Sequence, residues 1–179
     1  NDQKTSMKFL PSTPNDLPEI HRLFDAAIDF QKLKFGKHWQ GLNEEQLRAE
    51  IVGDLHWKIM EGDRIAAFFS IASTDRLIWD ERDADPAIYL HRIVTNPEFR
   101  GRGYVTAITD WAEAYGRQAG KIFIRLDTDR ANDRLNAYYQ QCGYTYCGIK
   151  TFHDTNNPLI PKHYFGSGLN LYEKRIRVS

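Results

Sequence analysis

A glycine-rich segment between an apolar stretch and a helical pattern is the first candidate for chemistry. It reads Arg100, Gly101, Arg102, Gly103. Glycines let backbone N–H groups approach an anion, and the start of a helix adds unpaired N–H donors and partial positive charge. The two arginines add full charges. The segment therefore predicts a binding loop for a phosphate or pyrophosphate, with a tight turn carrying two solvated arginines as the structural alternative.

The loop does not match the two common nucleotide fingerprints. Thr106 stands where a dinucleotide-binding loop has its third glycine. The chain also has no GxxxxGK[ST] segment, which a Walker-type phosphate loop requires. A nucleotide-binding enzyme is therefore the weaker phosphate-ligand hypothesis.

The elements that must position this loop follow from the periodicity of apolar residues. Helices are expected from Asp16 to about Leu33, from Asn43 to Gly53, from 104 to Gly120 and from Asn132 to Gly143. Strands are expected at 7–10, 55–59, 65–71, 88–94, 122–126, 144–152 and 169–176. This order predicts an α/β fold with one central sheet and helices on both of its faces.

Local patterns add detail to these elements. Asp16 and Glu19 have the spacing of a capping box at the start of the first helix. In 55–59 the odd-numbered residues are apolar, which predicts that they face the core. The alternation in 88–94 slips by one residue, which indicates a bulge. Residues 74–86 are polar and are interpreted as a solvated connection between strands.

Composition excludes several functional classes. The chain has 24 basic and 24 acidic residues, which is not the balance of a general nucleic-acid or anionic-membrane binder. It has no apolar run long enough for a transmembrane helix, and residues 1–6 do not resemble a secretory signal. Cys142 and Cys147 alone make a poor disulfide framework, which favours a cytoplasmic location. Together with His153 they match no ordinary zinc spacing, so no metal site is expected.

The stretch from about Tyr89 to Gly148 resembles the GNAT superfamily of N-acetyltransferases. Three pieces in matching order carry this resemblance: the strand and pyrophosphate loop in Ile93–Gly103, the triplet Arg125-Leu126-Asp127, and the helix Asn132–Tyr144, which is similar to the family pattern Asn-x-x-Ala-x-x-x-Tyr-x-x-x-Gly-Phe. The resemblance implies a single domain over 1–179 with its cofactor-binding core at about 88–148. It also implies a mixed, mostly antiparallel central sheet of six to seven strands.

The resemblance implies that acetyl-CoA is the co-substrate and that no metal takes part. The residues expected to bind this cofactor are Ile93, Val94, Arg100, Gly101, Arg102, Gly103, Tyr104, Val105, Asn132 and Tyr139. The strand around Val94 is expected to pair with the pantetheine arm where it splays from the next strand. The backbone N–H near Val94 is expected to face the developing oxyanion. Val105 replaces the family's last small loop residue, so its side chain either crowds the pyrophosphate or points into the core.

The resemblance also implies the catalytic groups. Tyr139 matches the tyrosine that gives a proton to the leaving thiolate, although Tyr138 beside it can exchange roles with it. Asp127, at a strand end, is the first candidate for the base that takes a proton from the amine. His91, Glu98 and a chain of water molecules are the alternatives for that base.

The acceptor is expected to be a primary amine on a small molecule, attacked directly in a ternary complex. Its binding segments are expected at about 15–53 and 153–168, and the side chains singled out there are Phe35, His38, Trp39, Pro158, Pro161, His163, Tyr164 and Phe165. A packed surface loop is the structural alternative for these segments. The resemblance also implies that a homodimer can form, paired through edge strands near the C-terminus. The rival hypothesis is a non-catalytic acyl-CoA-binding or sensing module.

Overall fold

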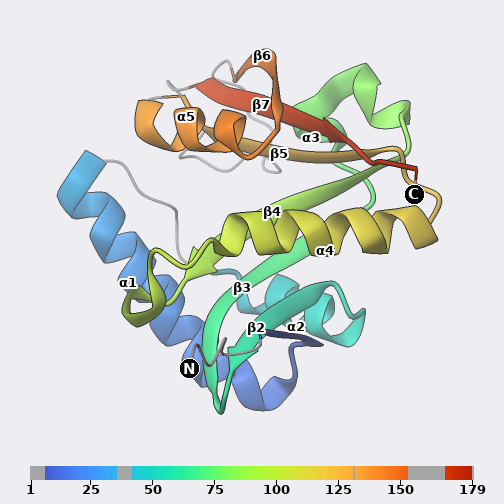
Figure 1. The fold of residues 1–179 in the computed structure, drawn as a ribbon. Helices are drawn as coiled ribbons and strands as arrows, with labels where there is room; N and C mark the ends of the chain where they lie inside the picture. Colours follow the sequence, from blue (N-terminus) through green and yellow to red (C-terminus); the bar gives the residue numbers. More distant parts are fainter. Residues whose placement is uncertain (1–6, 36–41, 131, 153–167, 179) are drawn as a thin grey trace, which may run out of the picture. The chain divides into compact units, whose positions relative to one another are not determined.

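The computed structural model describes residues 7–35, 42–130, 132–152 and 168–178. The chain forms two compact units (Figure 1). The first unit contains Asn1–Ile71 and Arg92–Tyr104, and the second contains Ala72–His91 and Val105–Ser179. The division passes through the strands β3 (Arg64–Ala72) and β4 (Ala87–Thr95) and the helix α4 (Tyr104–Gln118), so each unit is described by itself.

Apart from the short helix at Arg76–Trp79, the elements follow the order expected from the periodicity. The strands are β1 (Lys8–Pro11), β2 (His56–Glu61), β3 (Arg64–Ala72), β4 (Ala87–Thr95), β5 (Phe123–Asp129), β6 (Thr145–Thr151) and β7 (Gly168–Arg175). The α-helices are α1 (Leu17–Phe35), α2 (Glu44–Val52), α3 (Arg76–Trp79), α4 (Tyr104–Gln118) and α5 (Asp133–Gln141). Short 3-10 helices cover Pro14–Asp16, Asp80–Ala84 and Pro97–Phe99.

The strands form a seven-stranded sheet in the order β1-β2-β3-β4-β5-β7-β6. The pairs β1–β2, β2–β3, β5–β7 and β6–β7 are antiparallel, and β4–β5 is parallel. The register between β4 and β5 runs only from Ala87–Phe123 to Tyr89–Arg125. The expected mixed, mostly antiparallel sheet is therefore confirmed.

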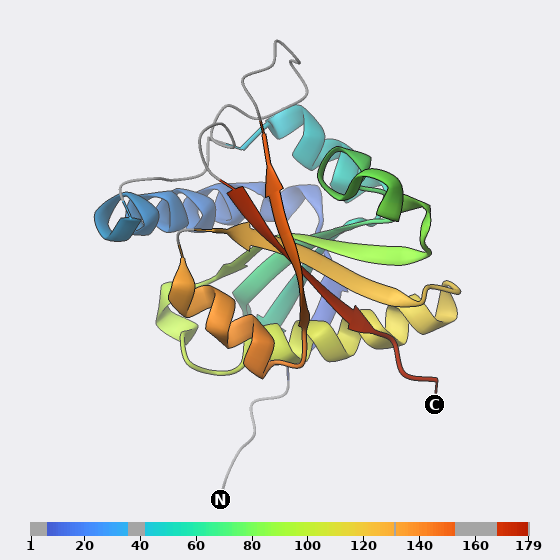
Figure 2. The same ribbon diagram turned by 90° about the horizontal axis from the view of Figure 1, so that it is seen from above.

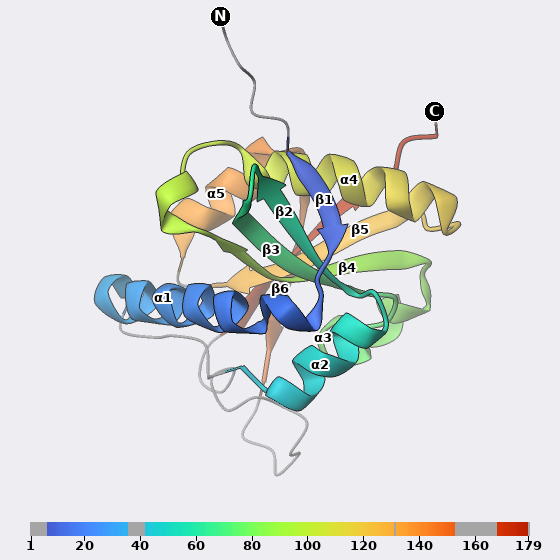
Figure 3. The same ribbon diagram turned by 90° about the horizontal axis from the view of Figure 1, so that it is seen from below.

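In the first unit, α1 and α2 lie against the sheet (Figure 3). Their apolar stripes meet β3 and the end of β4 in a core formed by Leu17, Ile20, Leu23, Phe24, Ile28, Leu47, Ile51, Ile65, Phe68 and Val94.

The helix α1 does not begin as expected. The Asp16 carboxylate accepts the Thr13 backbone N–H at 2.7 Å, whereas Glu19 pairs with Arg22. Pro14 occupies a first helical position without losing a hydrogen bond, so the capping interaction moves toward the N-terminus.

The strand β2 shows a second departure in the first unit. His56 is only 1% exposed, whereas Leu55 is 37% exposed, so the expected inward face at Leu55 is wrong. The Ser12 hydroxyl lies 2.6 Å from Nδ1 of His56 and supplies the buried ring with a hydrogen bond. Burial lowers the pKa of His56 to about 4, with a smaller effect from the Arg92 charge. A neutral histidine therefore belongs to the core here.

In the second unit, helices lie on both faces of the strands (Figure 2). On one face α4 approaches so closely that a Cβ at Gly116 would lie 2.6 Å from Ile176 Cδ1. The opposite face carries α3 and a core formed by Ile78, Trp79, Ala87, Tyr89, Phe152, Leu169 and Leu171. The expectation of a solvated connection over 74–86 is therefore wrong. Trp79 is 2% exposed because its ring packs against the Arg125 guanidinium, 4.7 Å away.

The middle of β4 is irregular, as the slip in its alternation indicates. Arg92 has a φ of 47°, which turns the strand out of phase at that residue. Its guanidinium pairs with Glu50 and donates to the Ser70 hydroxyl at 2.9 Å. These polar contacts hold the irregular backbone within the first unit.

Among the described residues, no helix has the length and apolar character needed to cross a membrane.

Candidate active site

The glycine-rich loop lies in the first unit, directly after β4. Asn96 anchors the start of this loop and is 1% exposed. Its side-chain amide donates to the Ile65 carbonyl at 3.0 Å, and its backbone N–H donates to the Ala66 carbonyl at 2.8 Å. Its side-chain oxygen accepts the Glu98 N–H at 3.1 Å, which starts the 3-10 helix Pro97–Phe99. The loop therefore leaves the sheet from a fixed point.

Two glycines give the loop its shape. Gly101 and Gly103 have φ values of 81° and 71°, a region that residues with a Cβ rarely adopt. A Cβ built at either position meets no atom within 4 Å, so open space lies beside the backbone. The helix α4 begins at Tyr104, and its first turn has N–H groups without partners inside the helix. Open space, backbone donors and a helix start fit a pyrophosphate group.

The two loop arginines have different surroundings. The Arg100 guanidinium lies over the Phe30 ring of α1 at 4.4 Å. The Arg102 side chain donates to a Glu61 carboxylate oxygen at 2.5 Å and lies 4.9 Å from the Phe99 ring. Arg102 is therefore not a freely solvated arginine, because a buried carboxylate holds it and offsets its charge.

The other residues assigned to the cofactor in this part of the chain are mostly buried. Val94 and Tyr104 are each 3% exposed, whereas Ile93 and Val105 are half-buried. Burial raises the pKa of Tyr104 to about 12, and the neighbouring Glu61 carboxylate adds to this shift. The Val94 side chain packs in the core with α1 and α2, so only its backbone is free to meet a ligand.

In the second unit, α5 carries the two remaining cofactor candidates. The Asn132 side chain accepts the Leu135 N–H at 3.0 Å and caps the helix. Tyr139 is 6% exposed and lies with its ring centroid 5.9 Å from that of Tyr172. Tyr138 is 37% exposed. The structure therefore places Tyr139, and not its neighbour, on the inner side of α5.

The hydroxyl of Tyr139 is held in its protonated form. Burial raises its pKa above the usual value, and the nearby Tyr144 and Asp127 add to the shift. A phenol in such surroundings is a proton donor throughout the neutral range. Its position and its protonation state are both compatible with the expected role of an acid.

A cluster of three titratable side chains from β4, β5 and the connection before α3 lies in the same unit. We call it the Asp75 cluster; it consists of Asp75, His91 and Asp127. Nε2 of His91 lies 3.4 Å from Oδ2 of Asp75, and one ligand atom from each side chain lies within 4.8 Å of the others. This spacing allows all three to contact one cationic group, either a protonated amine or a metal ion.

The Asp75 cluster follows directly after the paired part of β4 and β5. His91 is two residues beyond Tyr89, and Asp127 is two residues beyond Arg125, where the parallel register ends. Residues two apart in a strand share a face, so His91 and Asp127 project from the face that also carries Tyr89 and Arg125. Asp75 joins them from the connection between β3 and α3.

The two carboxyl groups of the Asp75 cluster have pKa values well above the usual range for aspartate. Burial raises the pKa of Asp127 to about 7. Burial also raises the pKa of Asp75 to about 7, and the negative charges of Asp127 and Asp83 add to this shift. A carboxyl group with a pKa near neutrality can both hold and release a proton at working pH.

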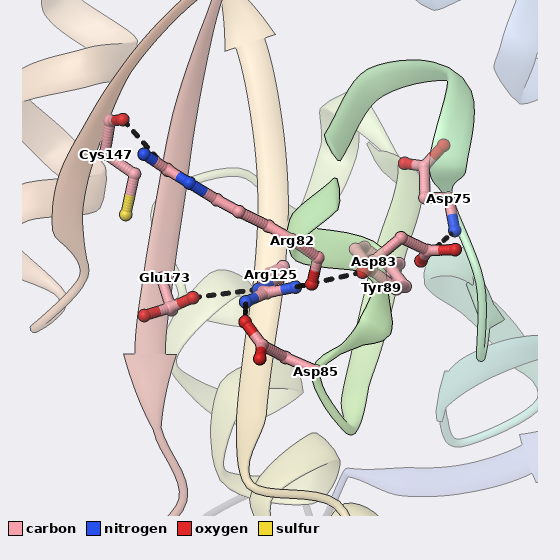
Figure 4. A network of polar contacts seen from close by, with 8 residues as sticks. All are labelled: Asp75, Arg82, Asp83, Asp85, Tyr89, Arg125, Cys147 and Glu173. Carbon is pink, nitrogen blue, oxygen red and sulfur yellow. Dashed lines mark hydrogen bonds and ion pairs between the residues drawn. The ribbon is translucent and has the colours of Figure 1, made fainter. Parts of the chain in front are cut away.

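Beside the Asp75 cluster lies a network around the Arg125 guanidinium (Figure 4). Arg125 is 1% exposed and donates to Glu173 at 2.8 Å, to Asp85 at 2.7 Å and to the Arg82 carbonyl at 2.7 Å. It also donates to the Tyr89 hydroxyl at 3.1 Å. Each of its three nitrogen atoms donates to at least one acceptor, which is the arrangement of a structural cation.

The remaining candidates from the sequence have other contacts. Glu98 is exposed and pairs with Arg64 in the first unit. In the second unit, Sγ of Cys142 lies 3.8 Å from the Thr106 hydroxyl, and Cys147 contacts the Thr145 carbonyl at 3.5 Å. His38, Trp39 and residues 153–167 lie outside the described residues, as does the side chain of Phe35.

Asp75 is the member of the cluster that sequence reasoning missed. It lies in a polar segment that gave no periodic or motif signal, and it is far in sequence from Asp127. Only its 12% side-chain exposure and its contact with His91 reveal it.

Comparisons with known proteins agree with this geometry. The model of the Acetyltransferase (GNAT) family matches residues 20–144. The uncharacterized N-acetyltransferase YesJ of Bacillus subtilis is 25% identical over 174 residues, which cover 93% of this chain and 88% of that protein.

Solved structures share the fold. An acetyltransferase of the GNAT family from Listeria monocytogenes has a TM-score of 0.74 at 23% identity, covering 94% of each chain. The structure of yncA from Salmonella typhimurium, which holds its cofactor acetyl-CoA, has a TM-score of 0.66 at 12% identity and covers 97% of this chain and 95% of that one. Because the family model spans well over half of its length, this chain belongs to the GNAT family of acetyltransferases.

Proposed function

We propose that this acetyltransferase moves the acetyl group of acetyl-CoA directly to a primary amine of a small molecule in a ternary complex. The observation that carries the proposal is the loop after β4. Its glycines at positive φ leave open space beside backbone donors at the start of α4. The even balance of basic and acidic residues supports a small acceptor over nucleic acid or a membrane surface. The free thiols of Cys142 and Cys147 suit the reducing cytoplasm.

Binding of the cofactor uses mainly the backbone. In the first unit, the N–H groups of Arg100, Gly101, Arg102, Gly103 and Tyr104 would hold the pyrophosphate, followed by that of Val105 at the start of the second unit. The strand at Ile93 and Val94 would pair with the pantetheine arm. On α5, Asn132 would meet the cofactor while it caps its helix.

The bound cofactor supplies an activated acetyl group as a thioester, and the chain supplies the proton transfers. Asp127 is the proposed base, because its raised pKa lets it accept a proton near neutrality. Tyr139 is the proposed acid for the thiolate, because its raised pKa keeps the phenol protonated. The backbone N–H near Val94 would donate to the developing oxyanion. This sequence of steps needs no metal ion.

Cofactor binding is tested by thermal unfolding with acetyl-CoA, CoA, ATP and NAD. A ligand at a hundred times its Kd stabilises by about 2.7 kcal/mol, which corresponds to a shift of about 5–10 °C at this length. A shift with the CoA species alone supports the proposal, whereas a shift with ATP or NAD alone contradicts it. Thiol release with a panel of amines then separates an enzyme from an acyl-CoA-binding module.

The loop itself is tested with a matched pair of glycine variants. Gly103→Val and Gly62→Val both place a β-branched residue at positive φ, and neither Cβ meets a neighbour within 4 Å. Each should lose about 1–2 kcal/mol of stability through backbone strain. Only Gly103→Val should also abolish the thermal shift with CoA. Equal CoA binding by the two variants would exclude the loop as the pyrophosphate site.

The acid is tested with Tyr139→Phe and the adjacent Tyr138→Phe. The first should lower kcat by about 10²–10⁴-fold with nearly unchanged affinity for CoA, because only proton transfer to sulfur is lost. The second should leave kcat nearly unchanged. An unaffected kcat in Tyr139→Phe would remove this residue as the acid.

A further inference from the structure

The strand β4 bends at a residue whose side chain disfavours the bend. Arg92 has a φ of 47°, and within the described strands no other residue with a Cβ has a positive φ. Asp54 and Asp80 also have positive φ values, but they lie outside the strands, and aspartate tolerates this region better than arginine does. Such a conformation persists only where the surrounding contacts hold it in place. The contacts around Arg92 must therefore stabilise the bend.

Two other elements of the first unit hold the Arg92 side chain. We call Glu50, Ser70 and Arg92 the Arg92 clamp. Nη2 of Arg92 contacts both carboxylate oxygens of Glu50, with 2.5 Å to Oε2, and donates to the Ser70 hydroxyl at 2.9 Å. Nε2 of Gln46 donates to Oε2 of Glu50 at 3.2 Å, so the carboxylate is itself held on α2. The Glu50 and Arg92 side chains are only 14% and 25% exposed, which limits screening of the ion pair by solvent. The bend is thus tied to α2 and to β3.

The segment directly after the clamp is the one proposed to hold the acetyl end of the cofactor. Ile93 and Val94 follow Arg92, and the Val94 side chain is fixed in the core with α1 and α2. Two residues later, the Asn96 N–H donates to the Ala66 carbonyl at 2.8 Å. The chain is therefore fixed on both sides of this short segment. The torsion angles of Arg92 then decide where the N–H groups of Ile93 and Val94 point.

We propose that Glu50 and Ser70 are positioning residues, which act through the Arg92 guanidinium to hold the bend of β4. The bend in turn aims the backbone N–H near Val94 at the thioester carbonyl. The inference rests on the proposed function, in which that N–H faces the developing oxyanion. It adds the groups that set the direction of the N–H. The three side chains of the clamp do this without touching the cofactor or the acceptor.

A simpler residue would adopt this backbone without a clamp. Glycine takes a positive φ with no steric cost, yet position 92 carries arginine. The arginine limits the bend to one geometry, because its guanidinium is bonded to two other elements, whereas a glycine leaves the same torsion angles free. An ion pair that only joins α2 to β4 is the alternative. The two interpretations differ in what they predict for glycine and alanine at this position.

The first test compares Arg92→Ala with Arg92→Gly in the full chain. The probe is acetyl-CoA labelled with carbon-13 at the thioester carbonyl, whose infrared band falls in frequency when a donor binds the oxygen. In the wild type, this band should lie lower for bound than for free acetyl-CoA. Arg92→Ala should lose the lowering, because alanine keeps the steric cost of the positive φ without the clamp, and Arg92→Gly should retain most of it. The Kd for CoA should change by less than about threefold in both variants, because Asn96 anchors the loop separately.

Asp80 provides a matched control for the backbone change. It also has a positive φ, of 51°, and its carboxylate forms an ion pair with Lys150 at 2.9 Å. Urea denaturation should show that the glycine variant is more stable than the alanine variant at Asp80 and at Arg92 alike. Neither Asp80→Gly nor Asp80→Ala should alter the carbonyl band. The comparison therefore separates a general effect of backbone strain from its effect on the bound thioester.

The second test asks whether Glu50 and Ser70 act through Arg92. Glu50→Gln removes the charge of the acceptor and Ser70→Ala removes the hydroxyl, and each should reduce the lowering of the carbonyl band. In the Arg92→Gly background neither change should have a further effect, because the bend no longer depends on the clamp. Effects of the same size in both backgrounds would show that these residues do not act through Arg92 and would contradict the inference.

Contrary results of the first test separate the inference from the proposed function. A wild-type chain that shows no thermal shift with acetyl-CoA or CoA refutes the proposed function and the inference with it. A wild type that binds acetyl-CoA without lowering the carbonyl band overturns the inference and leaves cofactor binding intact. So does a wild-type band in Arg92→Ala, or an equal loss of the lowering in Arg92→Ala and Arg92→Gly, because an ion pair that only joins two elements would give these results.

Discussion

Two neighbouring clusters on β4 and β5 contain similar residues and behave in opposite ways. Around Arg125, a buried cation meets Glu173, Asp85 and the Tyr89 hydroxyl, so every charge has an opposite or polar partner. Two residues further along β5, Asp127 lies near His91 of β4 and near Asp75 of the connection between β3 and α3. The first cluster pairs a permanent cation with carboxylates, whereas no arginine or lysine of the described residues lowers the pKa of Asp75 or Asp127.

The two clusters differ in how their surroundings set the pKa of each carboxyl group. Burial raises the pKa of a carboxyl group, and a permanent cation beside it opposes that shift. No permanent cation opposes this shift at Asp75 and Asp127, and the pKa of each rises to about 7. In the first unit, burial lowers the pKa of the His56 ring and keeps it neutral, and the Ser12 hydroxyl gives it a hydrogen-bond partner. Burial alone therefore does not distinguish a structural group from a candidate for proton transfer, and the neighbouring charges must be considered as well.

The largest expected effect comes from Asp127→Asn. Activity should fall by about 10²–10⁴-fold, because the amide cannot take a proton from the amine. CoA binding, measured by thermal shift, should be retained. The control is Glu81→Gln, and full activity in Asp127→Asn would show that the two clusters do not differ in the proposed way.

Arg125→Met should show the reverse pattern. Removing the buried cation leaves Glu173 and the Arg82 carbonyl without their donor, which should cost about 3–5 kcal/mol in the free energy of unfolding. The measurement is urea denaturation, with the exposed Arg134→Met as the control. A loss below about 1 kcal/mol would contradict the structural role of this network.

The pH dependence of stability should differ between the wild type and Asp127→Asn. The pKa of Asp127 is raised from 3.8 to about 7, so the folded state binds this proton more tightly than the unfolded state. The resulting stabilisation is complete below about pH 4 and is lost as the pH rises through about 7, a change of about 2–4 kcal/mol. Denaturation between pH 4 and 8 should therefore show the wild type losing more stability than the variant. If the two proteins gave parallel curves of stability against pH, the raised pKa of Asp127 would be disproved.

A structural carboxylate in the same unit should respond with the opposite sign. Hydrogen bonds from Arg177 lower the pKa of Glu113 to about 2, despite its burial. Its contribution to stability is present above about pH 4.5 and is lost as the pH falls toward 2. Because Arg177 is largely exposed, Glu113→Gln should cost only about 1–3 kcal/mol at pH 7, measured by urea denaturation. A stabilising effect of Glu113→Gln at pH 7 would be inconsistent with this pairing.

The sequence alone determined the order of the elements, the loop and the family resemblance. These features are local: apolar periodicity defines helices and strands, and Gly101 and Gly103 are needed where the backbone takes a positive φ. The role of Asn132 as a helix cap could also be predicted, because a cap depends on residues only three apart. The irregularity at Arg92 was visible as a slip in alternation for the same reason.

Only the tertiary structure decided what the charged side chains do. The polar segment 74–86 was interpreted as solvated, yet it supplies Trp79 to the core and Asp75 to a buried cluster. Tyr139, and not Tyr138, lies on the inner side of α5, because its ring packs against the ring of Tyr172. Such outcomes depend on which distant groups share a low-dielectric space, because burial and neighbouring charge set a pKa and neither is encoded in local spacing. The sequence thus specified the scaffold, and the pairing of Asp75 with Asp127 arose only when the chain folded.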